Sequence, residues 1–124
     1  MINLPNMWRP QVDEFPKIKK FEQQEVAEAL AYAAEGGLAI HLHNVIPDDR
    51  KAPQCFVRAV KRGERIAHVF GNDAEVLRAF ARKVGVRVIY VHREGTAKQH
   101  IDMCSLPLRR AIGFAEHRER KGQQ

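Results

Sequence analysis

Residues 72–91 read NDAEVLRAFARKVGVRVIYV, a helix pattern followed directly by a strand pattern. Asn72 and Glu75 have the spacing of a capping box, which predicts that the helix begins there. Gly85 ends it, because glycine is the preferred residue just after a helix C-terminus. The stretch 86–91 is the most strongly β-branched of the chain and predicts a buried strand. The buried stripe of the helix comprises Val76, Leu77, Phe80, Ala81 and Val84.

The alternation of helices and strands extends in both directions from this segment. We expect helices at 22–35, 54–62 and from 105 to about 112, strands at 38–45 and 65–70, and a short extended or turn-like segment at 100–104. Such an order predicts parallel strands joined by crossovers, with helices on both faces of the sheet. The predicted fold class is therefore α/β, a small three-layer sandwich with a three- or four-stranded, mainly parallel sheet.

The length of 124 residues fits one domain. Residues 1–21 contain three prolines and show neither a helix nor a strand period, so we expect an extended N-terminal arm. Residues 22–116 form the single α/β domain of this prediction, and 117–124 form a polar, basic tail. The arm and Trp8 could also clasp a second copy of the chain, so a homodimer is one interpretation.

Composition excludes several classes of protein. Hydrophobic residues make up 44% and charged residues 29%, which argues against disorder, collagen-like repetition and a disulfide-built miniature. No apolar run approaches the length of a membrane span, and the first ten residues lack a secretory signal, so we expect a cytoplasmic protein without a membrane partner. Cys55 and Cys104 are then expected to be reduced thiols. The sequence predicts no cofactor.

The formal net charge of +6 is concentrated in two segments. Four basic residues against one acidic residue lie at 58–65, and five against two lie at 109–121. Local density of this kind favours a binding module for nucleic acid or a nucleotide-like anion, such as a phosphorylated small molecule. The alternative is that both segments are solvated surface. The predicted anion-binding residues are Arg58, Lys61, Arg62, Arg65, Arg109 and Arg110.

The sharpest chemical pattern is HIDMC at 100–104. In an extended backbone His100, Asp102 and Cys104 point to one face, and Ile101 and Met103 point to the other. An aspartate beside a histidine orients the ring, so His100 as general base or metal ligand and Asp102 as its partner are candidate catalytic residues. The alternative is a polar outer face over an apolar inner one.

His41 and His43 form an HxH pair on one face of the strand predicted at 38–45. This spacing recurs among metal ligands, so both are candidate metal-binding residues, but two imidazoles leave the coordination incomplete. His68, Asp48, Asp102 or Cys104 could complete it, and otherwise the histidines are buried and satisfied. The second functional hypothesis is therefore a hydrolase or nuclease-like enzyme that depends on His and Asp and possibly on a metal. It requires a further histidine or carboxylate close to His100.

Residues 38–112 resemble the Domain of Unknown Function 4031 family, which comprises small bacterial and phage proteins without an established activity. The resemblance rests on the strand AIHLHNV, the passage VLRAFARKVGVRVIYV and the closing His100-x-Asp102 followed by Arg109 or Arg110. In the family the first strand typically ends in paired acidic residues, whereas this sequence has His43 and Asn44. Since the family has no established activity, the resemblance supports only the α/β fold and the choice of His100 and Asp102 as candidate functional residues.

Overall fold

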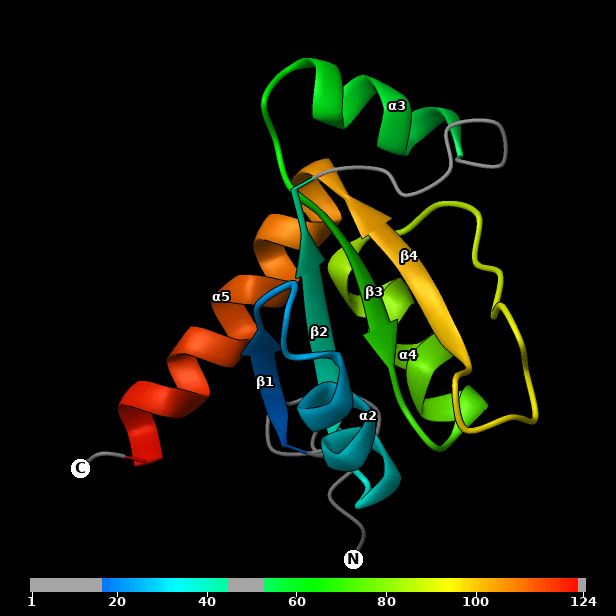
Figure 1. Cartoon of the computed structure of the whole chain (residues 1–124), viewed down its shortest axis with the longest axis vertical. Helices are drawn as coiled ribbons and strands as arrows, with labels where there is room; N and C mark the ends of the chain where they lie inside the picture. The colour runs from blue at the N-terminus through cyan, green and yellow to red at the C-terminus, as the bar shows by residue number, and fades with distance from the viewer. Residues whose placement is uncertain (1–16, 45–52, 123–124) are drawn as a thin grey trace, which may run out of the picture.

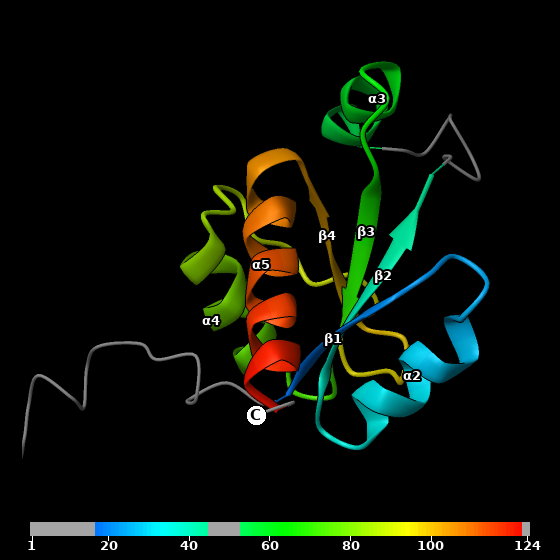
Figure 2. The same cartoon turned by 90° about the vertical axis from the view of Figure 1, so that its left-hand side faces the viewer.

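The computed structural model describes residues 17–44 and 53–122 (Figure 1). The elements, in chain order, are β1 (Ile18–Phe21), α2 (Val26–Ala34), β2 (Leu38–His43), α3 (Gln54–Lys61), β3 (Ile66–Phe70), α4 (Ala74–Val84), β4 (His100–Cys104) and α5 (Ser105–Gly122). The α/β class and a four-stranded sheet are confirmed. Helices α4 and α5 cover one face of the sheet, α2 lies on the other, and α3 lies at one end of the sheet (Figure 2).

The prediction of a mainly parallel sheet is wrong. The strand order is β1-β2-β3-β4, in which β1 and β2 are parallel whereas β2 with β3 and β3 with β4 are antiparallel. Two strands joined by a helix are parallel only when the helix returns the chain to the end of the sheet where the first strand began. Helix α3 instead lies at one end of the sheet, so β3 starts near the end where β2 finished (Figure 1).

The second antiparallel pair has its own cause. Helix α4 does run back along the sheet, but residues 85–99 then descend along the outer side of β4 (Figure 1). This return brings the chain to the end where β3 finished, and Phe70 and His100 pair directly. The strand predicted at 86–91 is not formed, because its residues pair with no strand and only His92 makes an isolated bridge, to His100.

Other boundaries also differ from the prediction. The last four residues of the predicted arm, Ile18–Phe21, are strand β1. Asp73, not Asn72, caps α4, since its side chain accepts the amide hydrogens of Glu75 and Val76. Gly85 ends that helix with a φ of 93°, as expected of a glycine in the left-handed region. Helix α5 continues well beyond the predicted end near residue 112.

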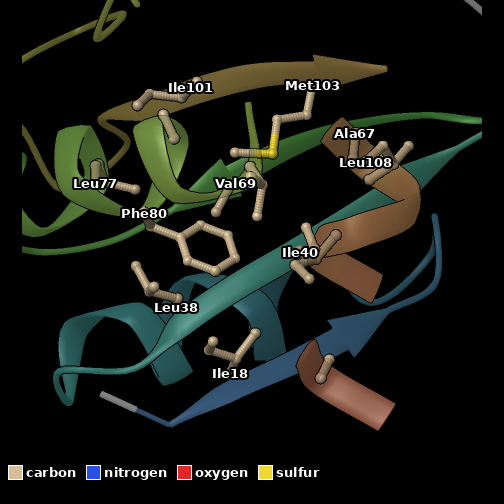
Figure 3. Packing of buried hydrophobic residues seen from close by; sticks show 14 of the residues in the cluster. Ile18, Leu38, Ile40, Ala67, Val69, Leu77, Phe80, Ile101, Met103 and Leu108 are labelled. Atoms are coloured by element: carbon tan, nitrogen blue, oxygen red, sulfur yellow. The ribbon is translucent and has the colours of Figure 1, made fainter. Parts of the chain in front are cut away.

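The main hydrophobic core lies between the sheet and the helices α4 and α5 (Figure 3). Ile18 of β1 and every second residue of β2, β3 and β4 from its apolar face enter it, and Phe80 of α4 is fully buried at its centre. The residues that the strands contribute are Ile18, Leu38, Ile40, Leu42, Ala67, Val69, Ile101 and Met103. Because neighbouring residues of a strand point to opposite faces, the intervening residues of β2, β3 and β4 all lie on the other side of the sheet. Among the described residues, no helix has the length and apolarity that a membrane span requires.

Candidate active site

The second face of the sheet carries two small apolar clusters with polar residues between them. Toward one end, α2 packs on Phe21, Ala39 and Phe70, and toward the other, α3 packs on Ile66 and Cys104. The strand residues between these clusters are His41, His43, His68, His100 and Asp102. Ladder pairing places His41 opposite His68 and His68 opposite Asp102, so that one row of the sheet crosses three strands.

Asp102 is the centre of this cluster. His68 Nδ1 lies 2.7 Å from Asp102 Oδ1, His100 Nε2 lies 3.4 Å from the same oxygen, and His92 Nε2 lies 3.1 Å from Oδ2. The carboxylate side chain is only 14% exposed. Burial opposes its ionisation, but hydrogen bonds from His100 and His68 and the charges of His68 and His92 hold the pKa of Asp102 well below its usual range.

The rings form a continuous row that runs from solvent into the protein. Consecutive ring centroids are 4.7 Å apart for Tyr90 and His92, 5.2 Å for His92 and His100, and 4.6 Å for His100 and His68. The row continues over 4.9 Å to His43 and 4.4 Å to His41. Tyr90 is 65% exposed, whereas His41 is 3% exposed. The cluster is therefore open to solvent at the β4 side and buried beneath β2.

The hydrogen bonds of His100 define how its ring can act. Its Nδ1 lies 2.9 Å from the carbonyl oxygen of Lys98, which can only accept, so Nδ1 carries a proton. In the singly protonated ring the Nε2 lone pair then faces the carboxylate oxygen of Asp102 at 3.4 Å. The Nε2 lone pair and the carboxylate oxygen repel each other unless a positive charge lies between them. That charge is either a second imidazole proton or a metal cation. A ring nitrogen that donates to a backbone carbonyl is also the usual way in which metal-binding histidines are oriented.

Among the described residues, His41 and His43 each have one buried ring nitrogen that makes no hydrogen bond. His41 Nε2 donates to the carbonyl oxygen of Gln23 across 2.9 Å, which leaves the buried Nδ1 without a hydrogen bond. The buried Nε2 of His43 also lacks one. Burial, with the charges of His68 and His41, lowers the pKa of His43 to about 4. Buried polar nitrogens are normally satisfied, so both require a ligand or a water molecule.

One group of side chains has the geometry of a metal site. Ligand atoms of His68, His100 and Asp102 all lie within 4.8 Å of one another. Two imidazoles and a carboxylate suit Zn²⁺ and other divalent first-row metals, and three protein ligands leave a position open for water. The arrangement can therefore hold a hydrolytic metal ion at the surface of the cluster.

The structure brings together most of the residues that the sequence singled out for chemistry. His100 and Asp102 are adjacent as expected, and His41 and His43 reach them through His68. Sequence reasoning missed His92, which lies between the segments predicted at 86–91 and 100–104. The signal was the alternation of residues 86–91, since its continuation by one residue places His92 on the same side as Tyr90.

The predicted anion-binding residues are distributed differently. Arg62 donates to Glu64 and to Ser105 at the start of α5, and Arg65 pairs with Glu22. Arg110 donates to the carbonyl oxygen of Val84 at the end of α4. The exposed residues Arg58, Lys61 and Arg109 make no ion pair with another described residue. Arg62 thus reaches the start of α5, and the charge of Arg109 acts on Glu64, so the two basic segments lie near each other. Binding of an anion by them stays a prediction.

The chain matches no protein-family model, no curated protein and no solved structure. The resemblance to the Domain of Unknown Function 4031 family therefore stays a prediction.

Proposed function

We propose that the protein is a metal-dependent hydrolase of phosphoesters, with His68, His100 and Asp102 as the metal ligands. The observation that carries this proposal is the approach of their ligand atoms to within 4.8 Å, on three residues from two paired strands. Strand residues in a hydrogen-bonded ladder are held more rigidly than loop residues, which suits a metal site. The second argument is the approach of His100 Nε2 to Asp102 Oδ1 within 3.4 Å, because a metal ion can take the place of the second imidazole proton between them.

The charge of the chain favours an anionic substrate. The net charge of +6 attracts phosphate esters, and Arg65 lies close enough to act electrostatically on His43 within the cluster. A divalent metal ion supplies Lewis-acid activation of water and of the phosphoryl oxygens. In the hydrolysis of a diester, the hydroxyl of water forms a bond to phosphorus while the bond from phosphorus to the leaving oxygen breaks. The remaining hydrogen of water ends on the leaving oxygen.

His92 is the residue of the cluster that is best placed to move this proton. Its side chain is 40% exposed, and its Nε2 lies 3.1 Å from Asp102 Oδ2 at the open end of the row. Proton transfer requires a group within hydrogen-bond reach of the reacting water, and the solvent side of the ligand set offers that position. His43 and His41 continue the row of rings inward from His68.

Metal binding is tested by titrating the metal-free chain calorimetrically with Zn²⁺ and with Mn²⁺. We expect one tight site for at least one of these ions, and a loss of affinity greater than about 100-fold in His100→Asn and Asp102→Asn, since even indirect partners of a metal contribute 10- to 100-fold. Hydrolysis of bis(p-nitrophenyl) phosphate by the metal-loaded chain is the matching activity assay.

His117 provides the matched control. It is the sixth histidine of the chain and lies exposed on α5, outside the cluster. His117→Asn should keep the metal affinity and the activity of the unaltered chain. Equal metal affinity in His100→Asn, Asp102→Asn and His117→Asn, with circular dichroism confirming that all are folded, would overturn the proposed site.

A further inference from the structure

The segment 86–98, named the strap here, lies along the open edge of β4 beside the candidate site (Figure 1). His92 and His100 exchange two backbone hydrogen bonds, of 2.8 and 3.0 Å, which fix the register of the strap. Just before the bridge, Val91 is 6% exposed and enters the main core, whereas the neighbouring Tyr90 is 65% exposed and contacts His92. The strap therefore holds Tyr90 on the same side as His92.

Tyr90 lies at the solvent-exposed end of the row of rings. Its ring contacts His92 edge to face at 4.7 Å, and His92 in turn stacks on His100. The hydroxyl-bearing ring is mostly free of protein, although large aromatic side chains are usually buried. The aromatic surface of Tyr90 is thus separated from His100, one of the proposed metal ligands, by the single ring of His92.

The strap also carries positive charge. Arg87, Arg93 and Lys98 are exposed, and the acidic residue of the strap, Glu94, is paired with Arg78 at 2.7 Å. Exposed basic side chains together with an exposed aromatic ring are the combination that binds single-stranded nucleic acid, since bases stack on the ring and phosphates contact the cations. Duplex bases are already stacked on each other and cannot use such a ring.

We infer that the strap recognises single-stranded nucleic acid, with a base stacked on Tyr90 and the adjoining phosphodiester directed to the metal-binding residues. This inference rests on the proposed function and names its substrate class. It uses a different surface from the basic segments at 58–65 and 109–121. Arg93 and Lys98 then contact phosphates on either side of the stacked base.

Binding is tested without metal, so that no turnover occurs. The full chain in EDTA is titrated against a fluorescent 12-nucleotide single strand and against the matched duplex, and anisotropy is recorded. We expect preference for the single strand and a rise in Kd of about 5- to 150-fold in Tyr90→Ala, the range found when a stacking aromatic is removed. Tyr90→Phe, which keeps the ring, should bind as tightly as the unaltered chain.

Charge is tested with two double variants of equal net charge. Arg93→Gln with Lys98→Gln should weaken binding and reduce its salt dependence, whereas Arg82→Gln with Lys83→Gln, on exposed positions of α4, should not. Unchanged binding in Tyr90→Ala, or equal loss in the two double variants, would overturn the inference.

The inference and the proposed function can fail separately. If the metal-loaded chain cleaves bis(p-nitrophenyl) phosphate but Tyr90→Ala binds the single strand normally, the hydrolase stands and the inference is wrong. If binding depends on Tyr90 but no metal is bound, the strap is a nucleic-acid surface and the metal site is wrong.

Discussion

His68 and Asp102 are direct partners in the β3–β4 ladder, and the imidazole Nδ1 donates to the carboxylate Oδ1 across 2.7 Å. Both side chains are largely shielded from water, with exposed fractions of 27% and 14%. A short hydrogen bond to an ionised group in such a position stabilises the fold even without a metal ion. The pair therefore serves the sheet as well as the candidate site.

The first prediction is an energetic coupling between these two residues. In a double-mutant cycle of His68→Asn and Asp102→Asn, measured by urea denaturation in EDTA, the coupling energy should be about 1–3 kcal/mol. The reason is that each single change replaces the imidazole or the carboxylate with a neutral amide, which weakens the short charge-assisted hydrogen bond. The pair of His117→Asn with Asp102→Asn is the control and should be additive. Additivity in both cycles would contradict the role of the hydrogen bond.

The second prediction concerns thermal stability and metal. A ligand that binds only the folded chain stabilises it by about 2.7 kcal/mol at a concentration 100 times its Kd. For a chain of this size the melting temperature should rise by about 5–15 °C, as followed by circular dichroism. EDTA should reverse the rise. In His100→Asn the same metal concentration should leave the melting temperature unchanged, and an equal rise in that variant would point to binding elsewhere.

The third prediction concerns Cys55, which is exposed as a residue but whose sulfur contacts Cys104. Burial of the sulfur and a hydrogen bond with Cys104 raise the pKa of Cys55 to about 12. Since only the thiolate is alkylated, modification by iodoacetamide at pH 8 should be on the order of 1,000-fold slower than for a cysteine of ordinary pKa. The rate should increase with pH up to about 12.

Peptide mass spectrometry after timed alkylation measures this rate for Cys55 alone. Cys104→Ala removes the hydrogen bond, so the pKa of Cys55 should fall and its alkylation should become faster. Urea-unfolded chain provides the reference rate. A folded rate that equals the unfolded rate at pH 8 would show that the sulfur is freely accessible.

The parts of the fold that depend on local sequence were predictable. The apolar stripe of α4 and the alternation in β2 and β3 each identify an element and its buried face. Strand direction was not predictable, because alternation of elements does not say at which end the chain re-enters the sheet. The positions of helix α3 and of the strap determine the directions of β3 and β4, and the periodicity of these segments does not indicate their positions (Figure 1).

The candidate site likewise has features that local sequence predicts and features that it does not. That His41 and His43 share a face, and that His100 and Asp102 share one, follows from strand alternation alone. That His68 lies opposite both His41 and Asp102 depends on the register of three strands, which no local pattern contains. His92 enters through one isolated bridge and is the least accessible to sequence reasoning.

The last prediction concerns the strand that was expected at 86–91. The ladder is not formed and burial along the segment does not alternate, but Val91 fills the main core while Val88 is 86% exposed. Val91→Ala should therefore reduce the free energy of unfolding by about 2 kcal/mol, since it removes buried methyl groups. Val88→Ala, the same chemical change three residues earlier, should stay within about 0.5 kcal/mol of the unaltered chain. Urea denaturation of the two variants measures the difference, and equal losses would mean that the strap pairs along its whole length in solution and buries both side chains.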